Sequence, residues 1–103
     1  MEQDNYFVIV YRILTYLYEC FQAGKRADLD MISPEILKIN NGYWINVIES
    51  MFEERYVSGV TKATMGIQID NLKIKQTGIE YLQESSMMKK AKKEIVRDYN
   101  YIN

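Results

Sequence analysis

The chain has 103 residues, which is enough for one domain with one hydrophobic core. It is 48% hydrophobic and 26% charged, values that are ordinary for a globular protein and that argue against disorder. The net charge is -1, histidine is absent and Cys20 is the single cysteine, so an internal disulfide and zinc or Cys-His chemistry are excluded.

Residues 4–22 have the period of an amphipathic helix. Its main apolar stripe consists of Val10, Ile13, Leu14, Leu17 and Phe21. Further apolar side chains, Ile9, Tyr16 and Cys20 on one flank and Tyr11 and Tyr18 on the other, widen this stripe. The arc covers roughly 200°, about twice what contact with one core needs. The helix should therefore touch a second surface, and we favour the C-terminal helix of the same chain over a second copy. Cys20 is expected to be a small buried hydrophobic residue.

Ala23 and Gly24 are expected to end this helix. The alternation of polar and apolar residues over 28–32 predicts a short strand. Ser33-Pro34-Glu35 then has the chemistry of a helix start, because it supplies a capping hydroxyl, a proline where no amide is needed, and an acidic group at the positive helix end. This second helix should end near Ile39.

A tight turn over residues 40–42 should lead into a third helix, with a single buried stripe of Trp44, Val47, Ile48, Met51 and Phe52. Two helices joined by so short a turn indicate a helix-turn-helix.

Residues 57–62 predict a strand and residues 63–66 the tip of a hairpin. In the return strand, Ile67 and Ile69, then Leu72 and Ile74, keep a period of two on either side of residues 70–71, which predicts a bulge or turn there.

Thr77-Gly78-Ile79-Glu80 matches a capping box, so a helix should begin at Thr77 and break near Ser85-Ser86. A final helix, about 86–101, places its apolar residues on one face and its basic residues opposite. The apolar face consists of Met88, Ala91, Ile95, Tyr99 and Ile102. These elements predict an α+β fold over a single domain, residues 1–103: a winged helix-turn-helix with a three-helix core, a β-hairpin wing and additional C-terminal helices.

Four segments of the chain are similar to a known family. They are Met31-Ile32-Ser33-Pro34-Glu35, Tyr43-Trp44, residues 56–61 (YVSGVT) and residues 77–91 (TGIEYLQESSMMKKA). They resemble the YjcQ-like proteins, small proteins of bacteria and their prophages. The resemblance implies a winged-helix fold and a phage-related role, and it carries over no catalytic or ligand-binding residue.

Catalysis has little support in the sequence. Glu49 and Glu53 share a helix face, but this face is expected to be solvated, whereas acid-base chemistry needs a cleft that excludes water. The five glycines are dispersed and form no phosphate-binding loop. We therefore expect no enzymatic activity, no cofactor and no metal. Without a signal peptide or a membrane span, the chain is expected to be cytoplasmic.

DNA binding is the function that the predicted fold suggests. The exposed face of the third helix would enter the major groove, but Glu49 and Glu53 on this face would be repelled by phosphates. Residues 1–56 have a charge balance of -4 and residues 57–103 one of +3, so contact with a polyanion should favour the C-terminal half. The candidate DNA-binding residues are Tyr43, Asn46 and Ser50 on the third helix, Lys62 on the wing, and Lys89, Lys90, Lys93 and Arg97 on the final helix.

Two hypotheses about function remain open. The first is a DNA-binding or regulatory accessory protein that holds duplex DNA weakly through the basic final helix and the wing. The alternative is a protein-interaction module without DNA binding, whose partner is another protein or a second copy of the chain. Its candidate contact residues are Tyr11, Tyr18, Glu49 and Glu53.

Overall fold

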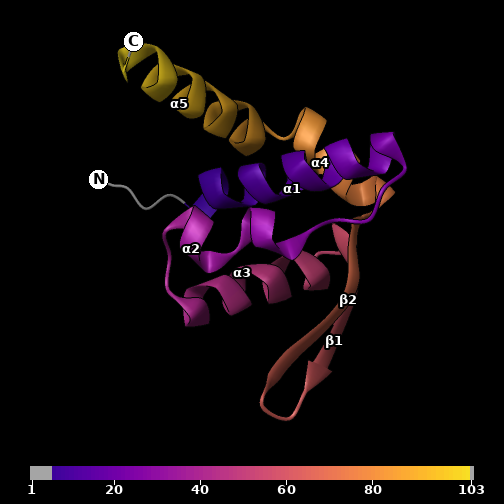
Figure 1. The fold of residues 1–103 in the computed structure, drawn as a ribbon. Helices are drawn as coiled ribbons and strands as arrows, with labels where there is room; N and C mark the ends of the chain where they lie inside the picture. Colours follow the sequence, from indigo (N-terminus) through magenta and orange to yellow (C-terminus); the bar gives the residue numbers. More distant parts are fainter. Residues whose placement is uncertain (1–5, 103) are drawn as a thin grey trace.

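The computed structural model describes the backbone of residues 6–102 and the side chains of residues 6–95. It is α+β, with five α-helices, one 3₁₀ helix and a two-stranded antiparallel hairpin in the described residues, and this arrangement is compatible with a winged helix (Figure 1). The elements are α1 (Tyr6–Ala23), η1 (Leu29–Ile32), α2 (Pro34–Leu37), α3 (Asn41–Glu53), β1 (Val57–Ala63), β2 (Gly66–Ile74), α4 (Gln76–Glu84) and α5 (Ser86–Ile102).

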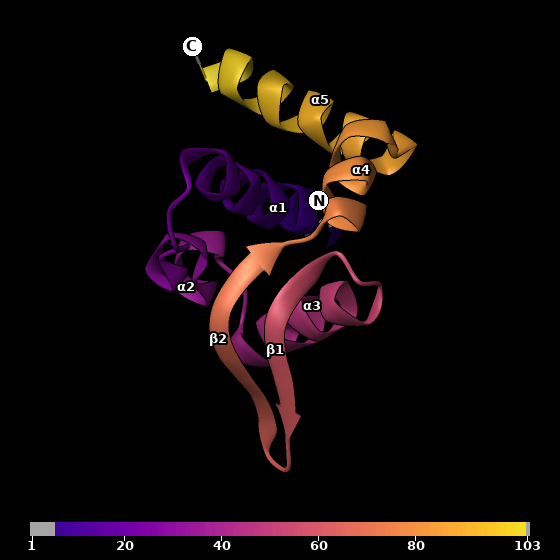
Figure 2. The same cartoon turned by 90° about the vertical axis from the view of Figure 1, so that its right-hand side faces the viewer.

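Helix α1 lies at the centre of the molecule. It packs against α3 and β2 on one side and against α4 and α5 on the other, and both views show it between α3 and α5 (Figures 1 and 2). Ile13, Leu14 and Leu17 are fully buried, and Cys20 is buried as expected. The wide apolar arc of α1 is thus covered within the chain. Phe21, which the sequence placed in the main stripe, is instead 46% exposed.

The first three helices end in the same way, with one residue in the left-handed conformation. At the end of α1 this residue is Gly24, as predicted, with φ 67°. At the ends of α2 and α3 it is Lys38 (φ 60°) and Arg55 (φ 66°), neither of which marks a helix end in the sequence. The following amides bond back to the last turn, as Tyr56 N does to Met51 O at 2.9 Å. Helix α2 therefore stops at Leu37, before the predicted end near Ile39.

The strand predicted over residues 28–32 is wrong, because η1 occupies this segment. The Asp28 carboxylate accepts a hydrogen bond from the Asp30 amide at 3.0 Å, which caps the first turn of η1. The Ile32 carbonyl accepts one from Trp44 Nε1 at 2.8 Å. Since the described sheet contains only β1 and β2, no strand is beside this segment to pair with it, and the local caps decide its conformation.

Helices α2 and α3 each begin directly after the residue that caps them. Ser33 caps α2 as predicted, since its hydroxyl accepts from the Ile36 amide. Asn40 caps α3 in the same way, accepting from the Tyr43 amide at 2.8 Å. Residues 41 and 42, which were predicted to lie in a turn, are therefore already helical. The predicted buried stripe of α3 is present, although its last member, Phe52, is only half-buried.

The predicted irregularity in the hairpin is confirmed. Near the helices Ser58 pairs with Lys73, whereas towards the tip Val60 pairs with Ile69, so Gly59 lies opposite three residues of β2. Asn71 takes a left-handed conformation, φ 61°, and Gly59 has φ 92°. A Cβ at residue 59 would lie 2.5 Å from the Asn71 carbonyl oxygen, so this bulge requires glycine at that position.

The base of the hairpin is closed by α4. The Lys75 amide donates to the Tyr56 carbonyl at 2.8 Å, and the rings of Tyr56 and Tyr81 stack with centroids 4.3 Å apart. Helix α4 begins at Gln76, one residue earlier than predicted, and the capping box is absent because the Thr77 hydroxyl donates to the carbonyl of Arg55. Burial raises the pKa of the Tyr56 hydroxyl, as expected for a ring enclosed at this junction.

Helices α4 and α5 meet at the predicted break. The Ser85 hydroxyl accepts from the amides of Met87 and Met88, which caps α5. Met88 and Ala91 are buried and Ile95 is half-buried, as the predicted apolar face requires. The side chains of Tyr99 and Ile102 lie outside the described residues.

We expect Gly78→Ala to destabilise the fold strongly. A Cβ at this position would overlap the Tyr56 carbonyl oxygen and lie 2.9 Å from Ile74 Cγ1, so α4 would have to move away from the hairpin. The free energy of unfolding, measured in urea, should fall by roughly 2 to 4 kcal/mol.

Gly42→Ala is the matched control, because Gly42 is also helical but its Cβ would meet nothing closer than Asn40 Oδ1 at 3.4 Å. This change should be neutral or stabilise by up to about 1 kcal/mol. Equal losses in both variants would mean that the close approach at Gly78 is not what holds α4.

Candidate nucleic-acid interface

The face of α3 that the sequence assigned to DNA is mixed in exposure. Asn46 and Glu53 are exposed, whereas Tyr43, Glu49 and Ser50 are half-buried. The Ser50 hydroxyl accepts a hydrogen bond from the Tyr6 hydroxyl at 3.0 Å, and Tyr43 packs against the hydrophobic core. A groove-binding role for Ser50 would therefore compete with a contact to α1.

Lys62, the wing cation, is paired with α3. Its ammonium donates to Glu53 Oε2, and both side chains are about half exposed to solvent. The hydrogen bond and the negative charge of Glu53 raise the pKa of Lys62, and the charge of Glu49 adds to this effect. This pair could not be predicted from the sequence, because nine residues and a chain reversal separate its members. As a result the one cation expected to reach phosphate from the wing is already neutralised.

The first half of α5 carries the densest basic surface of the described residues. Lys89, Lys90, Lys92 and Lys93 are all exposed, and none is paired with a carboxylate in the part of the chain that the structure describes. At about 100° per residue these four side chains span an arc of roughly 160°, directly opposite Met88 and Ala91. We call Lys89, Lys90, Lys92 and Lys93 the lysine face. Lys92 was not among the predicted residues, and the side chain of Arg97 lies outside the described residues.

The candidate residues do not form one surface. In both views α1 separates α5 from α3, and the hairpin extends on the α3 side (Figures 1 and 2). The helix that carries the lysine face is thus separated by α1 from α3, on whose side the hairpin that carries Lys62 extends. The alternative contact residues are likewise divided between two helices, with Tyr11 and Tyr18 half-buried on α1. The Tyr18 hydroxyl accepts from Gln83 Nε2 of α4 at 3.3 Å, so it takes part in packing within the chain.

Fold and surface together define a small α+β protein, in which an acidic helix and its hairpin lie on one side of α1 and a lysine-rich helix on the other. The chain belongs to the YjcQ family: a family model described as "YjcQ protein" matches residues 11–99, most of its length. Searches of curated proteins and of solved structures gave no match. Among the described residues, no helix has the length and apolar character needed to cross a membrane.

The pairing of Lys62 with Glu53 can be tested on the lysine itself. In Glu53→Gln the pKa of Lys62 should fall towards its ordinary value of 10.5, because the charged acceptor is lost. Glu49→Gln should give a smaller decrease. The pKa is measured by following the ε-carbon resonance of labelled lysine as pH is raised.

Glu54→Gln is the control, since Glu54 precedes the turn into β1 and does not contribute to the raised pKa of Lys62. If Glu54→Gln lowered the pKa of Lys62 as much as Glu53→Gln does, the summed negative charge near α3 would explain the raised pKa. The assignment of a direct pair between Lys62 and Glu53 would then be wrong.

Proposed function

We propose that this YjcQ-family protein is a phage-associated accessory factor of winged-helix type that binds duplex DNA weakly and without reading its sequence. The observation that carries the proposal is the lysine face of α5, with four exposed lysines among residues 89–93. Support for the winged helix comes from the order of the elements, in which η1, α2 and α3 precede a hairpin. The phage association rests on the resemblance alone.

Charge favours α5 over α3 as the surface that meets DNA. Phosphate oxygens are attracted to unpaired ammonium groups, whereas Glu49 and Glu53 would oppose the approach of α3 to either groove. The nearest cation on the hairpin, Lys62, is held by Glu53 and offers no compensation. Backbone contact through α5 leaves the base edges unread, so the binding should be independent of sequence.

The size of the lysine face sets the expected strength. Residues 89–93 rise by about 6 Å along the helix, and phosphates of one strand recur about every 3.4 Å along the DNA axis, so two or three contacts fit at once. The salt slope should then be roughly -1.8 to -2.7, and raising the salt from 50 to 200 mM should weaken binding roughly 10- to 40-fold. The dissociation constant should be about micromolar or weaker.

A protein-interaction module is the second candidate, and the exposed acidic side of α3 favours it. Glu53 lies on this side, and a basic partner could displace Lys62 from it. Within this second candidate, a second copy of the chain as the partner is less favoured, because α1 packs against α3, α4, α5 and β2 of its own chain.

The charge assignments predict different outcomes for two sets of variants. Lys89→Glu with Lys93→Glu should weaken binding to a labelled duplex and reduce the salt slope by about two units, whatever the DNA sequence. Glu49→Gln with Glu53→Gln should leave binding unchanged if α3 points away from the duplex. Fluorescence anisotropy at several salt concentrations measures both.

Lys25→Glu with Lys38→Glu controls for net charge, because it changes the charge equally at exposed positions outside α5. These substitutions should cost less than half as much affinity as those in α5. Equal losses of affinity in the two sets of lysine variants would show that DNA binding responds only to the net charge of the protein. If the unmodified protein did not bind duplex DNA at 50 mM salt, the protein-interaction module would be favoured. If the glutamine variants abolished binding, α3 would be the reading helix and the proposal would be wrong.

A further inference from the structure

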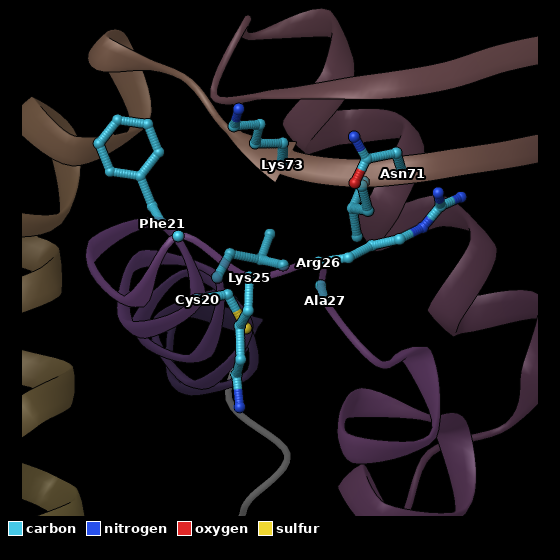
Figure 3. A pocket seen from close by; sticks show the side chains of 10 residues that line it. Cys20, Phe21, Lys25, Arg26, Ala27, Asn71 and Lys73 are labelled. Atoms are coloured by element: carbon cyan, nitrogen blue, oxygen red, sulfur yellow. The ribbon is translucent and has the colours of Figure 1, made fainter.

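A cavity outside the surfaces discussed so far lies between the C-terminal end of α1, the segment that follows it, and β2. Its volume is about 380 Å³. Leu17 and Cys20 of α1 and Leu72 of β2, all buried, form its apolar floor. Phe21 forms one wall, and Lys73 and Asn71 lie along the β2 side (Figure 3). The volume is near the lower end of the roughly 300 to 1,000 Å³ of small-molecule sites.

The walls of this cavity are held by contacts that do not depend on a ligand. The Lys25 amide bonds back to the Cys20 carbonyl at 3.0 Å, which fixes the chain where it leaves α1. Arg26 reaches across to β2, where its guanidinium donates to Asp70 Oδ1 at 3.0 Å. Asn71 is set by the left-handed bulge conformation of β2. The cavity is therefore formed in advance, which limits the ordering that a ligand would require.

The charge around the cavity has one sign. Lys25, Arg26 and Lys73 line it, and no acidic residue does. Asp70 engages one nitrogen of Arg26, but a guanidinium has five N–H donors, so others stay available. The Lys73 ammonium lies 5.8 Å from the centre of the Phe21 ring and pairs with no carboxylate in the described residues. In Figure 3 the Lys25 side chain points away from Lys73 and the Arg26 side chain extends to the other side, which leaves Lys73 as the cation beside Phe21.

Besides its positive charge, the cavity has an exposed aromatic ring, that of Phe21. A phenylalanine that is 46% exposed beside a buried apolar floor offers a surface on which a flat apolar group could stack. A cation beside an exposed aromatic ring is the complement of a molecule with an acidic group at one end and a flat apolar body at the other.

We infer that this cavity binds a small amphipathic organic anion, with its acidic group at Lys73 and its apolar body against the exposed Phe21 ring. Such a ligand would bridge α1 and β2 at the bulge, next to the root of the hairpin. The inference does not rest on DNA binding, because none of these residues belongs to α5.

Naphthalene-2-sulfonate is a suitable probe, since it combines a flat bicyclic body with one negative charge. Titration into nitrogen-15-labelled protein should shift the backbone amides of Gly24, Lys25, Leu72 and Lys73 saturably and with one-to-one stoichiometry. With about 14 heavy atoms and the binding strength per atom that is typical of drug-sized ligands, the probe should have a dissociation constant near 1 mM or tighter. The neutral analogue 2-naphthalenemethanol should bind at least about tenfold more weakly, and inorganic sulfate should not saturate these shifts.

Lys73→Gln should weaken the probe about tenfold, because it removes a charge-assisted contact while leaving an exposed, folded position. Lys75→Gln is the matched control: it removes the same charge two residues further along and outside the cavity, and it should change the affinity by less than about twofold. A thermal melt checks that both variants stay folded. Equal binding of the neutral analogue, equal losses in the two variants, or no saturable shift up to 10 mM probe would each overturn the inference.

Discussion

The close approach of α4 to the chain at Tyr56 holds the two halves of this fold together. Gly78 has no side chain, so the backbone of α4 can lie against the Tyr56 carbonyl, which also accepts the Lys75 amide. The Thr77 hydroxyl and the stacked Tyr56 and Tyr81 rings add contacts at the same place. The turn from α3 into β1 and the turn from β2 into α4 are thereby joined. Since α4 leads directly into α5, this junction also fixes where α5 lies against α1.

The consequence for the surface is a separation of charge by position. α5 carries its lysines on the side of α1 opposite to α3, and α3 uses Glu53 to hold Lys62 of the hairpin. A positively charged ligand and a negatively charged ligand would therefore bind to different sides of this protein. The basic cavity at the end of α1 is a third site, separate from the lysine face in both its residues and its apolar floor.

Local chemistry was the part of the structure that the sequence could predict. Ser33 with Pro34 starts α2 and Gly24 ends α1, as expected. The expected break near Ser85 is present, and there the Ser85 hydroxyl caps α5. Predictions failed where a distant partner decides. Thr77 bonds to Arg55 instead of capping its own helix, and residues 28–32 lack a strand to pair with. Lys38 and Arg55 adopt a conformation that their side chains do not favour, so only packing could reveal those helix ends. The pair of Glu53 with Lys62 and the cavity were also missed, because residues distant in the sequence form them.

The bulge at Gly59 and Asn71 divides the hairpin into two parts with different registers. Val57 and Ile74 belong to the inner part, whereas Val60 and Ile69 begin the outer part, and Val60 is the last buried core residue of β1. Residues can be added to or removed from the two strands beyond this point in matched pairs without moving Leu72 or Ile74. Each added pair would extend the hairpin by about 3.3 Å. The reach of the hairpin is thus a trait that relatives could vary during evolution while their cores stay the same.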